Sequence, residues 1–196
     1  DCGGDRDQSR PLSDQSLPTP EAAGFALPEL PLDINIAEIV ANRVIFGEDL
    51  FGLATELSAT LSGRLDANGA ALNMDAIRLD GAGGQLALVF EYQRSEATFS
   101  VNLALEEPEN GVIANALNIE GKPAVDARLS GQGPLDDLAI VLAVDTAGDN
   151  LINGRLRTGQ SELGRTFTGQ FDGRLSPLIP QGYRDFFEGN STIDVE

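Results

Sequence analysis

Residues 53 to 105 read LATELSATLSGRLDANGAALNMDAIRLDGAGGQLALVFEYQRSEATFSVNLAL, and apolar and polar residues alternate along most of this segment. Successive side chains of an extended strand point to opposite faces, so an alternation with period two produces one apolar and one polar face. Short turns rich in glycine separate the alternating runs, and Asn68-Gly69 is a strong hairpin signal. The segment therefore predicts a meander of antiparallel strands with one apolar face.

The first of these strands is expected from Leu53 to about Asp66. In the next strand the parity of the apolar residues changes between Met74 and Ile77, so we expect a β-bulge near Ala76 that keeps both on one face. Two further strands with the same polarity are expected at 85–92 and 98–105.

The region before residue 53 contains a linker and short strands. Five of the ten prolines fall within residues 1 to 31. Frequent proline together with low hydrophobicity predicts that this segment is a disordered linker. Short strands are expected at 32–36 and 43–46, with a turn at 47–49. Residues 37–42 fit either a strand or one helical turn.

After residue 105, the helical spacing of the apolar residues predicts a short helix at 111–117 that plugs one end of the apolar layer. A second short helix is expected around Tyr183, Phe186 and Phe187. Strands are expected near 125–129, 138–144, 152–156, 167–175 and 191–196. We therefore predict an all-β fold with two short helices, in which elongated antiparallel repeats curl into a trough (a β-taco) or a sandwich-like stack. The repetitive segment would span 32–196, with possible sub-units at 32–105 and 123–196.

The charge of the chain argues against several kinds of partner. A formal net charge of −18, from 31 acidic and 13 basic residues, repels nucleic acid and anionic lipid surfaces at long range. No apolar run approaches the roughly 18 residues needed to span a bilayer. The chain begins without Met, so we expect it to be part of a longer protein, and any membrane anchor or export signal would lie outside this segment.

No arrangement of side chains predicts an enzyme, a metal site or a cofactor. The chain has no His, and Cys2 is its only cysteine. The acidic groups at 106–109 and 145–150 do not match EF-hand spacing and are interpreted as solvated turns rather than calcium sites. The glycine-rich turn at 80–85 lies between strands, unlike a dinucleotide-binding loop. The neighbouring carboxylates Asp136 and Asp137 would point apart, unlike the acid pair of a glycosidase.

Several short elements of the chain resemble one known family. The most distinctive are Glu-Pro-Glu-Asn-Gly-Val-Ile-Ala at 107–114 and Gly-Gln-Gly-Pro-Leu at 131–135, and others lie at 30–36, 43–47, 80–88 and 121–125. With these elements, residues 27–196 resemble the amino-terminal half of the TamB family, the AsmA-like inner-membrane subunits of the translocation and assembly module.

This resemblance implies a location and partners. Proteins of this family are anchored in the inner membrane by an amino-terminal helix and extend across the periplasm as an elongated β trough with an apolar lining. They partner TamA, an outer-membrane barrel of the Omp85 class. They are implicated in phospholipid transport between the two membranes and in outer-membrane protein assembly.

The resemblance and the alternation together suggest a groove that holds phospholipid acyl chains while the headgroups stay in water. Each buried lipid methylene would contribute about 0.8 kcal/mol. The alternative is that the same residues fill the closed core of a β-sandwich, which would serve as a spacer or adhesion module without a ligand. The expected lining residues are Leu53, Leu57, Leu61, Leu72, Met74, Leu86, Leu88, Phe90, Phe99, Val101, Leu103 and Leu105.

Overall fold

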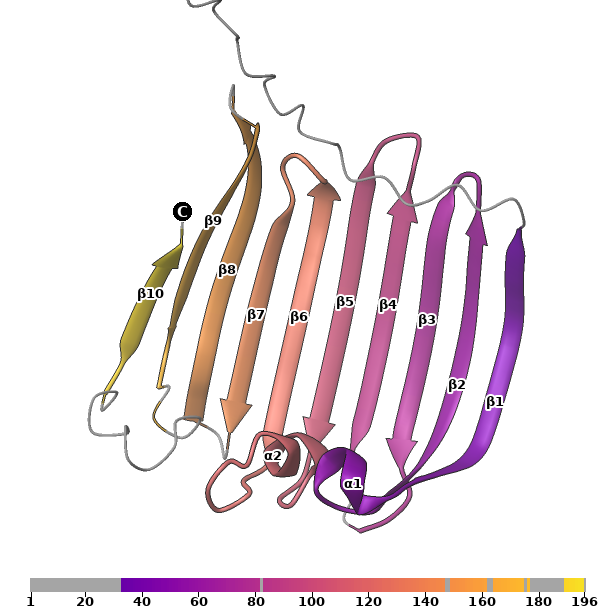
Figure 1. Cartoon of the computed structure of the whole chain (residues 1–196), viewed down its shortest axis with the longest axis vertical. Helices are drawn as coiled ribbons and strands as arrows, with labels where there is room; N and C mark the ends of the chain where they lie inside the picture. Colours follow the sequence, from indigo (N-terminus) through magenta and orange to yellow (C-terminus); the bar gives the residue numbers. More distant parts are fainter. Residues whose placement is uncertain are drawn as a thin grey trace, which may run out of the picture.

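The computed structural model describes residues 33–81, 83–146, 149–161, 164–174, 176 and 189–195. Within these ranges, ten strands form a single open sheet in which every strand is antiparallel to the next, and their spatial order is their order in the sequence (Figure 1). The all-β prediction is confirmed, and the sheet does not close into a barrel. The strands are β1 (Ile34–Phe46), β2 (Thr55–Asp66), β3 (Gly69–Arg78), β4 (Gln85–Gln93), β5 (Thr98–Glu107), β6 (Val125–Pro134), β7 (Ala139–Thr146), β8 (Asp149–Ser161), β9 (Gly164–Gly173) and β10 (Ser191–Val195).

The pairing register aligns most of the apolar residues of the ten described strands on one face, which we call the apolar face. One row of paired positions crosses the sheet through Ile39, Leu61, Met74, Leu88, Leu103, Leu129, Leu142, Gly154, Phe171 and Ile193. We call the opposite side the outer face, and one of its rows runs through Asn73, Val89, Asn102, Ser130, Val141, Arg155, Gln170 and Asp194. The alternation predicted for residues 85–92 and 98–105 is therefore confirmed.

The predicted hairpin between β2 and β3 is present. The carboxylate of Asp66 accepts hydrogen bonds from the backbone N–H groups of Asn68 (2.7 Å) and Gly69 (3.1 Å). Gly69 has φ +151°, and a Cβ at this position would overlap the carbonyl oxygen of Tyr92 on β4. This turn therefore requires glycine because the backbones approach closely.

The prediction of a β-bulge near Ala76 is wrong. β3 pairs with β2 and with β4 in unbroken register through this region, so the strict alternation continues to its end. Ile77 consequently lies on the outer face, where it is 55% exposed, and Arg78 takes a place on the apolar face. A bulge here would have interrupted hydrogen-bond ladders on both sides of an interior strand.

Bulges occur instead in the edge strand β1. Its pairing with β2 shifts between Ile36 and Ile39 and again between Ala41 and Val44. Residues 37–42 are therefore extended, and the two strands expected at 32–36 and 43–46 are one. The register shifts explain why apolar residues in this segment have a spacing that resembles a helix.

Two other boundaries differ from expectation. The turn predicted at 47–49 is wrong, because residues Glu48–Phe51 form the short helix α1. β2 begins at Thr55, so Leu53 precedes the strand. In addition, residues 131–134 extend β6, and the following turn falls at 135–138.

The helix predicted at 111–117 is confirmed as α2 (Val112–Ala116). Ala114 is fully buried in a small core with Ile119 and Val125, and Ile113 and Val144 pack against this core. Helices α1 and α2 contact each other and lie at the same end of the sheet (Figure 1). The helix expected at 183–187 lies outside the described residues, as do Leu175 and Glu196 of the expected strands.

Candidate functional site

The part of the apolar face on strands β2 to β5 contains all the predicted lining residues except Leu53. Most of these side chains are half-buried, and only Val101 among them is buried. Phe90 and Phe99 pack edge to face with 5.3 Å between ring centroids. The sequence therefore located a continuous apolar surface, although Leu53 lies in the connection before β2.

The partial exposure of this surface follows from the architecture. Within the described ranges, the main contacts join strands that are neighbours in the sheet and join α1 to α2. A sandwich would require a second sheet, whereas the described strands all belong to one. Leu88 and Leu103, in the middle of the sheet, are therefore only half-buried by their neighbours on the same face.

One end of the apolar face is hollowed into a pocket of about 340 Å³, which we call the helix-end pocket. Phe51 from α1 and Val112 and Ile113 from α2 form one side of it, and strands β2 to β5 form the floor. Phe51 also packs edge to face on Phe46, with 5.5 Å between ring centroids. The strand residues that line the pocket include Leu57, Ala76, Leu86, Leu103 and Leu105.

An arginine with a largely buried side chain forms part of the wall of this pocket. The side chain of Arg78 is only 9% exposed, and its guanidinium donates to both carboxylate oxygens of Asp80, at 2.8 and 3.1 Å. Asp80 also accepts hydrogen bonds from the backbone N–H of Glu56 (2.8 Å) and the hydroxyl of Thr55 (3.1 Å). These donors, above all Arg78, hold the pKa of the Asp80 carboxyl well below its usual range.

A buried carboxylate forms another part of the wall. Glu107 accepts hydrogen bonds from the backbone N–H groups of Val112 (3.0 Å) and Ile113 (2.7 Å), at the start of α2. These are amide groups that a helix cannot satisfy internally. The hydrogen bonds that Arg78 donates to Asp80 and the negative charge of Glu107 both raise the pKa of Arg78. The charged groups in the pocket wall are therefore compensated by partners within the protein.

Sequence reasoning missed both charged residues for identifiable reasons. The bulge expected near Ala76 would have directed Arg78 to the outer face. Glu107 was interpreted as part of a solvated acidic turn, but continuing the alternation from Leu103 and Leu105 places it on the apolar face. An uninterrupted period of two in both strands was the signal that could have located them.

The other acidic groups take part in local contacts. Asp136 and Asp137 form ion pairs with Arg165 (3.1 Å) and Arg157 (3.2 Å), respectively. The side chain of Asn150 donates to Asp145 at 3.1 Å. In the ranges that the structure describes, no three His, Cys, Asp or Glu side chains gather as metal ligands would.

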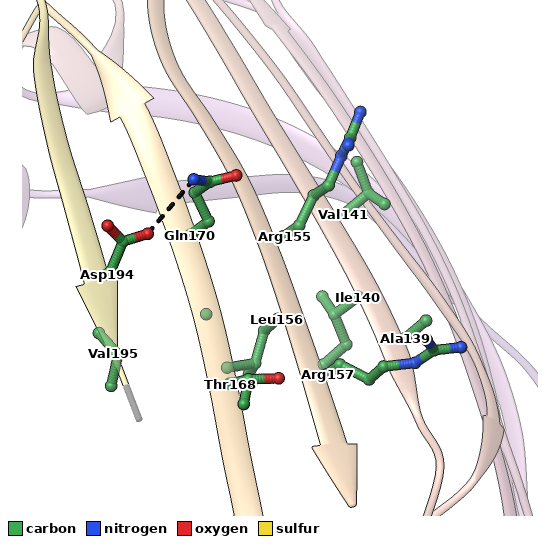
Figure 2. Close-up of a pocket in the computed structure, with 11 residues that line it drawn as sticks. Ala139, Ile140, Val141, Arg155, Leu156, Arg157, Thr168, Gln170, Asp194 and Val195 are labelled. Carbon is green, nitrogen blue, oxygen red and sulfur yellow. Dashed lines mark hydrogen bonds between the residues drawn. The ribbon is translucent and has the colours of Figure 1, made fainter.

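A second hollow, of about 580 Å³, crosses strands β7 to β10 (Figure 2). Arg155 and Arg157 project from β8 beside Val141 and Ala139, which are their paired residues on β7. Gln170 donates to Asp194 at 3.3 Å along the same surface. This hollow combines charged groups of both signs and lacks the apolar enclosure of the helix-end pocket.

Comparisons with protein-family models, with curated proteins and with solved structures find no match to this chain. Among the described residues, neither helix has the length and apolar character needed to cross a membrane.

Proposed function

We propose that this chain is a non-enzymatic, periplasmic segment of a TamB-like protein, and that its apolar face shields phospholipid acyl chains between the two membranes. The observation that supports this proposal is one continuous, half-buried apolar face across a single open sheet. Each methylene that moves from water onto such a surface contributes up to about 0.8 kcal/mol. A lipid carrier of this kind needs an apolar strip and no catalytic group.

The parent protein of the proposal is anchored in the inner membrane and partners a TamA-like Omp85 barrel in the outer membrane. Phospholipid transport and outer-membrane protein assembly are the two activities that accompany this arrangement. The strong negative charge of the chain is compatible with this role, because the headgroups would remain in solvent while the tails lie on the sheet.

Native mass spectrometry of the protein purified from a bacterial periplasm, followed by solvent extraction, tests this proposal. The wild-type chain is expected to carry phospholipid. Leu88→Asp, on the apolar face, is expected to lose the lipid while remaining folded, because its site is only half-buried. Val89→Asp is the matched control, since its side chain is 50% exposed on the outer face of the same strand.

Two results would contradict the proposal. One is a wild-type protein that carries no lipid and does not take it up from vesicles. The other is a folded Leu88→Asp variant that retains as much lipid as Val89→Asp. A lipid-free protein that Leu88→Asp unfolds and Val89→Asp leaves folded would favour the alternative, a closed core in a spacer or adhesion module.

A further inference from the structure

The helix-end pocket differs from the rest of the apolar face in being partly enclosed. Phe51 from α1 and Ile113 from α2 stand over strand residues that belong to the continuous rows of the face. Leu86 and Leu105, which pair across β4 and β5, line the pocket, and Leu88 and Leu103 form the next row of the same face. An apolar chain lying along β4 or β5 would therefore run directly into the pocket.

The chemistry of the pocket wall favours an apolar occupant. Arg78 is engaged by Asp80 and also donates to the carbonyl oxygen of Asn110 (3.4 Å). Glu107 is engaged by the first amides of α2. A charged headgroup would have to compete with these contacts in a partly buried place, where leaving a charge unpaired costs free energy.

We propose that the helix-end pocket receives the methyl ends of acyl chains, so that bound lipids lie along the strands with their headgroups toward the β2–β3 and β4–β5 hairpins. This inference rests on the proposed lipid-binding function. It adds the direction in which the bound lipid lies and the place where its acyl chains end. The residues of α1 and α2 that line the pocket then limit the length of chain that fits. Each methylene excluded from it would cost about 0.8 kcal/mol, hence about fourfold in affinity.

Tryptophan quenching tests the orientation, because the natural chain contains no Trp. Phe51→Trp places a single reporter in the pocket, and Phe99→Trp places one on the apolar face near the β4–β5 hairpin. The probes are phosphatidylethanolamines brominated either near the methyl end or near the headgroup end of the acyl chain. We expect Phe51→Trp to be quenched at least twofold more by methyl-end bromine, and Phe99→Trp to show the opposite preference.

A second measurement tests whether the acyl chains end in the helix-end pocket. Ala76→Leu adds volume within the pocket, whereas Ala87→Leu adds the same volume on the outer face of β4. Native mass spectrometry with an equimolar mixture of phosphatidylethanolamines that differ only in chain length gives the bound distribution. Ala76→Leu is expected to shift this distribution toward shorter chains by about fourfold per methylene, and Ala87→Leu to leave it as in the wild type.

The outcomes separate the two proposals. Lipid that binds with equal or reversed quenching at the two reporters overturns the orientation and leaves the lipid-binding function intact. An unchanged chain-length distribution in folded Ala76→Leu overturns the claim that the acyl chains end in the pocket. If Ala76→Leu does not fold, the quenching ratio decides alone. Failure of the wild-type chain and of both tryptophan variants to bind any of these lipids overturns the inference and the proposed function together.

Discussion

At the scale of single residues, the ion pair between the largely buried Arg78 and the half-buried Asp80 has the clearest energetic consequence. Asp80 compensates a guanidinium on the apolar face and accepts hydrogen bonds from the backbone of Glu56 and the hydroxyl of Thr55. Removing Asp80 would leave the largely buried guanidinium of Arg78 without its counter-charge, and this costs more than the network contributes as a whole. The fold therefore depends on Asp80 being ionised.

We expect Asp80→Asn to lower the free energy of unfolding at pH 7 by roughly 1 to 3 kcal/mol. Because folding lowers the pKa of Asp80, its contribution is present above the unfolded-state value of about 3.9 and is lost as the pH falls through and below it. The wild type should therefore lose stability progressively as the pH falls below about 5, with the loss continuing well below pH 3 because the folded-state pKa is so low, and Asp80→Asn should lose less. Denaturant unfolding at several pH values measures the difference. Asp75→Asn, exposed on the outer face, is the control, and equal pH dependence of the wild type and Asp80→Asn would refute the assignment.

At the scale of secondary structure, α2 is too short to be stable alone and depends on its surroundings. Ala114 and Ile119 anchor it in the small core, and Glu107 satisfies two of its amide groups from the end of β5. The strand and the helix are therefore coupled through one side chain.

Glu107→Ala is expected to remove this cap and to destabilise α2 by about 1 kcal/mol, a typical cost of losing an N-cap. Hydrogen exchange in residues 112–119 should accelerate, whereas exchange in β3 should change little. Glu107→Gln retains one acceptor oxygen, so its exchange rate in residues 112–119 should lie between the rates of the wild type and of Glu107→Ala. Glu109→Ala alters an exposed carboxylate of the same loop and serves as the control. Unchanged protection of α2 in Glu107→Ala would show that packing alone holds the helix.

The elements also show what a single sequence can reveal. Alternation located β4 and β5 closely, because a half-buried strand leaves a period of two in its residues. It failed in β1, where two register shifts reset the alternation, and at α1, whose four residues are too few to show a helical period. The contact of Glu107 with α2 could not be predicted, because it depends on how a turn folds back over the sheet. The apolar face was therefore predictable, whereas the pocket at its end was not.

At the scale of the whole molecule, each described strand is stabilised mainly by the strands next to it, two for the interior strands and one for β1 and β10, as in repeat proteins. Stability should therefore vary along the sheet, with the slowest amide exchange in β4 to β6 and the fastest in β1 and β10. Phe171→Ala offers a test, because the ring of Phe171 lies against the backbone of Gly154 on β8.

We expect Phe171→Ala to cost roughly 1 to 3 kcal/mol, less than the loss of a fully buried ring. Mass spectrometry of hydrogen exchange should show faster exchange in β8 to β10 and unchanged exchange in β2 to β4. Equal acceleration in every strand would mean that the sheet unfolds as one cooperative unit.

The sequential order of the strands also bears on how the chain acquires its structure. Each described strand after β1 pairs with the one just before it, so the contacts between strands join segments that lie close along the chain compared with its full length. A chain that emerges amino-terminus first, from a ribosome or from a translocation channel, can add each new strand to an edge that already exists. Folding can then keep pace with delivery, and little apolar sequence has to wait for a partner that has not yet arrived.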